Sequence, residues 1–290
     1  MASTANSASA ANQAATANGP TAANSVTILE QGRVGGIGDI GRGAGKPAAG
    51  GGGGGAAQVT RESDLAHWWK MDEGTGSTAA DSVGDADMTL SSATWESTTV
   101  RGGSAIDFDG TDDYLIGSLG DVSILSNYTI TAWVYWNAVS GWRTIWNLTY
   151  STTDTHFSQL MSVSGSQTFT NYHKKANISN VYVHVTDYED GDSGAGFVTG
   201  KWYHYATVWD GTAQTQKVYV NAVQIGSTTS GVDGWYESGG GVGLQPRMGM
   251  YSSPGTSWRV NGIMDDFRIY NAALSASDVG DIYGSGDGDF

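Results

Sequence analysis

The segment KWYHYATVWDGTAQTQKVYVNAVQI, residues 201–225, decides the fold of this chain. Two sets of side chains alternate over residues 202–209, one set being Trp, His, Ala and Val and the other Tyr, Tyr, Thr and Trp. This period of two predicts a strand with two distinct faces. Residues 210–213 interrupt the alternation and residues 217–221 restore it. The segment therefore predicts two antiparallel strands joined by a turn in which Gly211 adopts a positive φ.

Similar segments recur along the aromatic part of the chain. The longest alternating run is residues 127–136, and further strands are expected at residues 144–150, 156–163, 167–172, 180–186, 241–244, 247–251 and 263–270. Many short strands separated by Gly, Asn and Asp turns indicate an all-β fold, a two-sheet antiparallel sandwich or jelly roll. One short helix is expected near the end, because Ser275 and Asp278 have the spacing of a capping box.

The composition divides the chain into an arm and a domain. Every Trp, Tyr and Phe lies after Asp64, and residues 1–64 are rich in Ala, Ser and Gly, with six successive glycines at 50–55. Such a segment buries too little apolar surface to fold alone. The sequence thus predicts an extended low-complexity N-terminal arm (residues 1–64), a jelly roll (residues 65–284) and a C-terminal tail (residues 285–290).

The charge of the chain restricts its partners. The net charge is -15, and because residues 1–64 are neutral, all of it lies on residues 65–290. An acidic surface repels phosphate and anionic lipid, so binding to nucleic acid or to a membrane is not expected. The chain has no cysteine, and its first residues lack the basic and apolar regions of a conventional secretory signal.

The arm contains one apolar cluster, which is expected to contact neighbouring subunits. A short apolar run in an otherwise polar tail often marks a docking strand. The predicted assembly contact consists of Val26, Thr27, Ile28 and Leu29.

Six pieces of sequence, in order, resemble the LamG-like (concanavalin A-like lectin/glucanase) jelly roll over about residues 65–284. They are residues 68–76 with 81–82, 105–110 with 113–114, 130–134, 201–204, 218–221, and 262–270 with 274–275. The resemblance implies two curved antiparallel sheets, frequent calcium sites, and binding to glycans or proteins more often than catalysis. It does not fix the function, because one fold serves lectins, hydrolases and structural proteins.

Two groups of carboxylates compete as ligands for a structural calcium ion, which takes six to eight oxygens. The resemblance would bring together the first group, Glu73, Asp81, Asp265 and Asp266. The second group, Asp109, Asp112 and Asp113, lies in a tight turn. The competing interpretation is that aspartates in turns support the local backbone. The first group is the preferred prediction.

No catalytic constellation is evident, so the chain is predicted not to be an enzyme. A glycosidase needs two facing carboxylates, and the sequence contains no E-x-D-x-E pattern or near equivalent of the kind that the glucanase relatives carry on one strand. The five histidines lack zinc-ligand spacing. His204, inside the central strand, is expected to be a hydrogen-bonded residue of the sandwich.

Four aromatic residues are candidates for ligand binding because they lie beside glycine or in loop-like sequence. They are Trp142, Trp235, Tyr236 and Trp258. The apolar faces of sugars pack on such rings while their hydroxyls bond to polar groups. The alternative is that each ring belongs to the core or to a subunit interface.

The sequence favours a non-enzymatic protein of a large assembly. The preferred hypothesis is a virion protein, a capsid decoration or fibre component, which displays a lectin-like domain on the virion surface for host-surface glycans while the arm contacts neighbouring subunits. The alternatives are an extracellular, secreted carbohydrate-binding module of a polysaccharide-degrading system, and a purely structural protein without a ligand.

Overall fold

The computed structural model describes residues 61–119, 127–150, 156–163, 168–173, 181–185, 197–230, 244–251 and 258–284. The described segments begin with a short 3-10 helix, Glu62–Asp64, and end with the helix α1, Ala276–Gly284. Between them lie β1 Leu65–Trp69, β2 Thr78–Ala79, β3 Met88–Ser91, β4 Thr94–Glu96, β5 Ala105–Asp109, β6 Tyr114–Ile116, β7 Asn127–Trp136, β8 Trp142–Tyr150, β9 His156–Val163, β10 Thr168–His173, β11 Val181–Val185, β12 Trp202–Asp210, β13 Thr215–Val220, β14 Val223–Ser230, β15 Leu244–Met248 and β16 Asn261–Tyr270.

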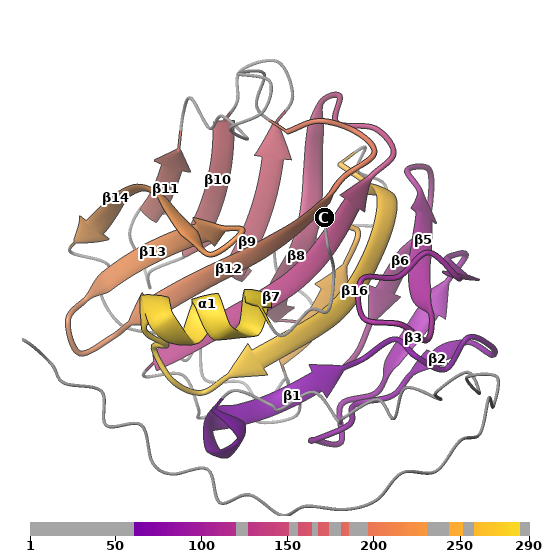
Figure 1. The fold of residues 1–290 in the computed structure, drawn as a ribbon, viewed down its shortest axis with the longest axis horizontal. Helices are drawn as coiled ribbons and strands as arrows, with labels where there is room; N and C mark the ends of the chain where they lie inside the picture. The colour runs from indigo at the N-terminus through magenta and orange to yellow at the C-terminus, as the bar shows by residue number, and fades with distance from the viewer. Residues whose placement is uncertain are drawn as a thin grey trace, which may run out of the picture. The chain divides into compact units, whose positions relative to one another are not determined.

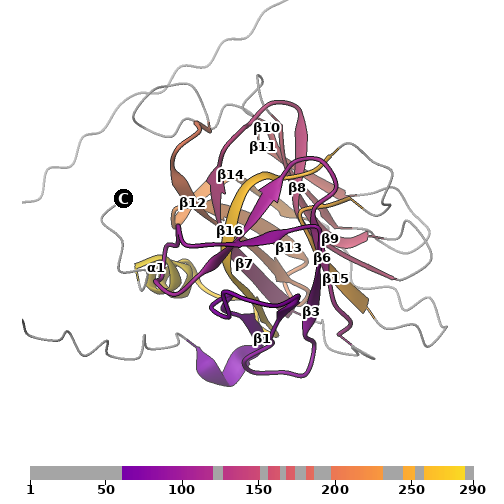
Figure 2. The ribbon, with the colours of Figure 1, turned by 90° about the vertical axis from the view of Figure 1, so that its right-hand side faces the viewer.

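These strands form two antiparallel sheets, which confirms the predicted sandwich (Figures 1 and 2). Sheet A has the order β14-β13-β12-β7-β16-β5-β4, with β1 also paired to β16. Sheet B has the order β11-β10-β9-β8-β15-β6-β3-β2. Long connections between the sheets bring distant segments together, so that β16, near the end of the chain, lies between β7 and β5.

Residues 202–220 form the hairpin of β12 and β13 in sheet A. Its strands pair antiparallel from Tyr205 opposite Val220 to Asp210 opposite Thr215. The turn differs from the prediction, because Gln214, with φ 52°, and not Gly211 adopts the left-handed conformation. The Asp210 carboxylate shapes this turn by accepting the backbone N–H groups of residues 212 and 213.

The main core lies between the sheets and is rich in aromatic side chains. It includes Trp69, Trp136, Trp146 and Trp209, each at most 1% exposed. On the central strands, every second residue enters this core, as the period of two requires. Both faces of β12 and β7 are nevertheless buried, so something must cover the other face of sheet A.

The helix α1 provides that cover over part of sheet A (Figure 1). Its Val279 and Ile282 pack in a second apolar cluster with residues of β12, β13 and β16. The predicted capping box is present: the Ser275 backbone N–H donates to Asp278 at 2.9 Å, and the Asp278 N–H donates to the Ser275 hydroxyl at 3.1 Å. No helix of the described segments is long and apolar enough to cross a membrane.

One prediction of strands is corrected by β15. The sequence predicted two strands, at residues 241–244 and 247–251, whereas the structure has the single strand Leu244–Met248. Pro246 lies inside it without a backbone N–H to donate. Its carbonyl still accepts the Gly117 N–H at 3.0 Å, so the strand continues across the proline. Residues 241–243 lie outside the described part of the chain.

Candidate functional site

Three half-exposed rings, Trp142, Tyr251 and Trp258, cluster where strands of both sheets begin or end. Trp142 opens β8, Tyr251 follows β15 and Trp258 precedes β16. The rings of Trp142 and Trp258 lie 6.1 Å apart, and those of Tyr251 and Trp258 lie 4.7 Å apart, edge to face. The structure therefore brings together two of the four aromatic residues that the sequence singled out.

Backbone hydrogen bonds fix the segments that carry these rings. The Thr144 N–H donates to the Trp258 carbonyl at 3.2 Å, and the Gly249 N–H donates to the Ile145 carbonyl at 3.0 Å. Gly249 has φ 76°, and a Cβ there would lie 2.5 Å from the ring of Phe108. Only glycine fits this position, where the chain turns toward Tyr251. The rings are thus held by a well-packed frame.

Arg143, the chain neighbour of Trp142, bonds to the backbone of the residue that follows Trp258. Arg143 donates from Nη1 to the Arg259 carbonyl at 2.8 Å and from Nη2 to the Ser140 hydroxyl at 3.4 Å. No carboxylate of the described residues pairs with it, and burial lowers its pKa from the usual value. Because a guanidinium has five N–H donors, Arg143 retains donors for a ligand rich in oxygen.

The acidic turn of Asp109, Asp112 and Asp113 is linked to this frame. Arg259, the neighbour of Trp258, donates from Nη1 to the Asp113 carbonyl at 3.2 Å. One carboxylate oxygen from each aspartate lies within 4.8 Å of the others, the only such group of three in the part of the chain that is described. Burial raises the pKa of Asp113. Oxygens at this spacing suit calcium, and calcium binding by the turn stays a prediction.

Each aspartate of the turn also supports the local backbone or a neighbouring side chain. Asp113 accepts the Asp109 N–H at 2.6 Å, and Asp109 accepts the Thr111 N–H at 2.7 Å. Asp112 accepts the Ser92 hydroxyl at 2.9 Å. The competing interpretation, that the aspartates shape the turn, therefore has direct structural support.

The preferred calcium group does not fit a shared metal site. Glu73, Asp81, Asp265 and Asp266 do not form a cluster of carboxylate oxygens among the described residues. Glu73 accepts the Ala80 N–H at 2.9 Å. The three aspartates make separate contacts with different partners.

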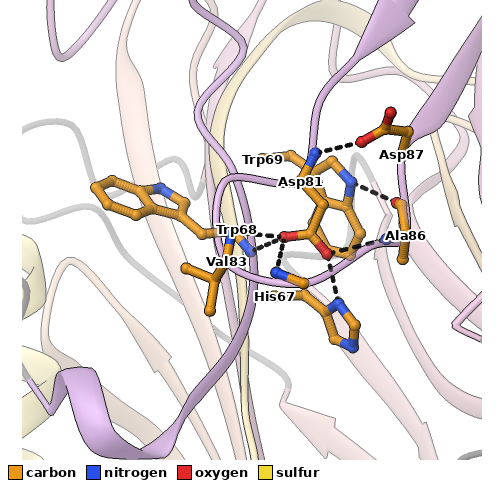
Figure 3. A network of polar contacts seen from close by, with 8 residues as sticks. His67, Trp68, Trp69, Asp81, Val83, Ala86 and Asp87 are labelled. Atoms are coloured by element: carbon orange, nitrogen blue, oxygen red, sulfur yellow. Dashed lines mark hydrogen bonds and ion pairs between the residues drawn. The ribbon is translucent and has the colours of Figure 1, made fainter.

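Asp81 holds the loop that follows β2 (Figure 3). Its carboxylate accepts the His67 ring N–H at 2.6 Å and the Trp68 backbone N–H at 2.9 Å. It also accepts the backbone N–H groups of residues 83, 84 and 86. Burial alone would raise the pKa of Asp81, but these hydrogen bonds hold it well below the usual range. The carboxylate therefore has a structural role, with both of its oxygens engaged in hydrogen bonds.

Asp265 and Asp266 occupy a bulge of β16 and have opposite electrostatic environments. Asp266, with φ 53°, pairs with Arg101 at 2.5 Å and Arg268 at 2.8 Å. Burial would raise the pKa of Asp266, but the two guanidinium groups keep it below its usual value. Asp265 accepts the Val100 N–H at 3.0 Å, and burial followed by the charge of Asp266 raises its pKa well above the usual value.

His204 departs from expectation. It is fully buried on the face of sheet A beneath α1, where its ring lies 5.1 Å from that of Trp133 and 6.0 Å from that of Tyr283. Neither ring nitrogen has a hydrogen-bond partner among the described residues. The sequence had predicted a hydrogen-bonded histidine.

The remaining predicted site residues lie outside the described residues. They are Trp235 and Tyr236, and the assembly contact Val26, Thr27, Ile28 and Leu29. Conversely, sequence reasoning missed Tyr251 and Arg143. The signal for Tyr251 was its position before the turn-like SSPG sequence. Nothing in the sequence indicated that Arg143 would have no acidic partner among the residues that the structure describes.

Comparisons with known proteins agree with this architecture. Residues 108–280 match the Concanavalin A-like lectin/glucanases superfamily. No curated protein matches the chain.

Several solved structures have a similar fold. The sialidase of Trypanosoma rangeli in complex with 2,3-difluorosialic acid has a TM-score of 0.57 and 13% identity over 79% of this chain and 34% of its own. The ligand binding domain of botulinum neurotoxin serotype D in complex with N-acetylneuraminic acid has a TM-score of 0.55 and 17% identity over 76% of this chain and 50% of its own. The chain thus spans between a third and a half of these relatives, and identities this low show the fold alone.

Proposed function

Because the chain belongs to the Concanavalin A-like lectin/glucanases superfamily, we propose that it binds carbohydrate at the cluster of Trp142, Tyr251 and Trp258. The observation that carries the proposal is the exposure of three adjoining rings on a frame held by backbone hydrogen bonds. Rings that only filled a core would be buried, as are Trp69, Trp133, Trp136, Trp146 and Trp209. An apolar sugar face can pack on these rings.

Polar groups beside the rings would bind the hydroxyls or a carboxylate of the sugar. Arg143 retains N–H donors and has no acidic partner among the described residues. The two relatives named above were crystallised with sialic-acid ligands, which supports carbohydrate as the class and makes sialylated glycans a sensible first probe. Few polar groups around an aromatic patch are typical of sugar sites.

We expect replacement of Trp142 or Trp258 by alanine to weaken glycan binding at least ~10-fold, since one stacking ring contributes on the order of 1 kcal/mol or more. A glycan array would identify the probe, and titration calorimetry would measure its affinity for the full chain. Trp95→Phe is the matched control, because Trp95 is half-buried elsewhere and donates to the Gly76 carbonyl. Wild-type affinity in both alanine variants would refute this site.

The proposal is binding without hydrolysis. Asp81 and Asp266 are occupied by hydrogen bonds and ion pairs, and Asp265 is fully buried, so these three carboxylates are poorly suited to attack a glycosidic bond. We expect incubation of the full chain with laminarin, agarose, carrageenan or alginate to release no reducing ends above the level in buffer alone. Turnover that one carboxylate substitution abolishes would show an enzyme.

We further propose that residues 1–64 anchor the domain in a large assembly, with a virion surface as the preferred setting and an extracellular carbohydrate-binding module as the alternative. The support is compositional: a neutral arm free of aromatic residues carries one apolar cluster, Val26–Leu29. Deletion of residues 1–64 is expected to leave a soluble domain that no longer enters the particle. Incorporation of the truncated chain at the wild-type level, measured in purified particles, would contradict this role.

A further inference from the structure

Four residues form a row across the face of sheet A that points away from sheet B. Trp202 on β12 lies opposite Tyr135 on β7, Tyr135 lies opposite Ile263 on β16, and Ile263 lies opposite Asp107 on β5. Directly opposed residues on adjacent strands share one face. The alternating neighbours of these residues, such as Val134 and Met264, belong to the core between the sheets. We call the four residues the open band, although Ile263 in its middle is only 6% exposed and the other three are half-buried.

The open band begins where the cover by α1 ends. His204 lies two residues from Trp202 on β12, and Trp133 lies two residues from Tyr135 on β7, on the same face. Both are fully buried against Tyr283 of α1. Trp202 and Tyr135 are half-exposed, with ring centroids 5.6 Å apart and planes inclined by 60°. The helix thus leaves an aromatic pair at the surface of the same sheet face.

A polar row borders the open band on its other side. Asn137 follows Tyr135 by two residues, and Asn261 precedes Ile263 by two residues, so both lie on the same face as the open band. Asn261 pairs with Asp109 of β5. Asn137 is exposed, and its amide lies 3.5 Å from the Asp107 carboxylate. The side-chain amide of Asn261 donates to the Asp109 carbonyl at 2.9 Å. Amide and carboxylate groups beside aromatic rings are the polar complement that sugar hydroxyls require.

The described residues offer no hydrogen-bond partner to the donors of the aromatic pair. Neither the indole N–H of Trp202 nor the hydroxyl of Tyr135 forms a hydrogen bond within the described residues, whereas the half-buried Trp68 and Trp95 both donate theirs. The carboxylates at this end, Asp107 and Asp109, give the face negative charge. An anionic ligand would be repelled, while an uncharged one would meet no such penalty.

We propose that the open band is a second carbohydrate-binding surface, which takes a neutral oligosaccharide lying across β12, β7, β16 and β5. Four strands separated by about 4.8 Å span roughly 14 Å, which suits several linked sugars rather than one. Sugar faces pack on Trp202 and Tyr135, and hydroxyls bond to the Trp202 indole N–H, to the Tyr135 hydroxyl and to Asp107. This surface is separate from the cluster of Trp142, Tyr251 and Trp258.

Fluorine NMR on the full chain labelled with 5-fluorotryptophan separates the two surfaces. The chain has 11 tryptophans, and Trp202→Phe, Trp142→Phe and Trp258→Phe assign the three resonances that matter. Titration with laminarihexaose and cellohexaose is expected to shift the Trp202 resonance saturably with at least one of them. Trp142→Ala should leave that shift intact, whereas Tyr135→Ala should weaken the apparent affinity at least ~10-fold, as expected for loss of one stacking ring.

Three outcomes of this titration would overturn the second surface. A Trp202 resonance that stays in place with both hexasaccharides, while those of Trp142 or Trp258 move, would overturn the second surface and leave the first. If all three resonances stay in place, both sites fail for neutral glycans. A Trp202 shift that Trp142→Ala abolishes would also overturn the proposal, because it would show one site instead of two. Tyr135→Phe, which removes only the hydroxyl, should reduce the affinity less than Tyr135→Ala.

Discussion

Replacing Asp266 with asparagine is expected to lower the free energy of unfolding by about 3–5 kcal/mol, the usual cost of removing one partner of a buried ion pair. The Asp266 carboxylate is 1% exposed and lies between Arg101 and Arg268, at 2.5 and 2.8 Å. It also accepts the Trp68 indole N–H at 2.6 Å. Asparagine would remove the carboxylate charge that pairs with both buried guanidinium groups. Urea denaturation at pH 7.5 measures the change.

Asp265, the neighbour of Asp266, provides a matched control, because its replacement is not expected to lower the free energy of unfolding. Asp265→Asn should leave the stability at pH 7.5 unchanged or raise it. Burial and the charge of Asp266 raise the pKa of Asp265, so the folded state favours its neutral form and loses stability as pH rises toward that pKa. Asparagine can still accept the Val100 N–H. Backbone strain does not confuse the comparison, because asparagine tolerates the left-handed φ of 53° at position 266. Equal losses in both variants would refute the ion-pair explanation.

Much of the fold could be predicted from local patterns. The alternation in β12 and the spacing of Ser275 and Asp278 each act within a few residues, so β12 and the helix cap appear where the sequence placed them. The alternation in β12 could not show which of its faces lies between the sheets and which lies under α1. The left-handed residue of the turn was also misplaced, because the Asp210 carboxylate stabilises the backbone around Gly211 without a positive φ.

The sites depended on contacts between distant segments. Trp142 and Trp258 were found because each ring lies beside a turn, but their contact with Tyr251 is set by how β8, β15 and β16 end. The sequence could not indicate that the bulge at Asp265 and Asp266 directs both carboxylates into separate buried contacts. The open band needs the register of four strands, which no single stretch of sequence contains.

Acid should destabilise the domain through His204 before most carboxylates titrate. The pKa of His204 is lowered to about 3, chiefly by burial; the charge of Asp266 raises it, and the charges of Arg101 and Arg268 lower it. The unfolded chain, with a histidine pKa near 6.5, therefore binds a proton that the folded domain does not. The contribution of His204 to the free energy of unfolding is fully present above pH 6.5. It falls by ~1.4 kcal/mol for each pH unit below that value, which amounts to about 3 kcal/mol by pH 4.

Urea denaturation between pH 7.5 and 4 measures this loss, and His204→Phe should flatten it. Phenylalanine keeps an aromatic ring against Trp133 and Tyr283 but cannot take up a proton in the unfolded chain. Tyr283→Phe serves as the control, because it preserves the ring stacked at 5.4 Å on Trp133 and leaves the histidine in place. That control should therefore retain the wild-type slope. If His204→Phe and wild type lose stability in parallel from pH 6.5 to 4, then the buried histidine is not the source of the acid sensitivity, and protons taken up elsewhere in the chain must account for it.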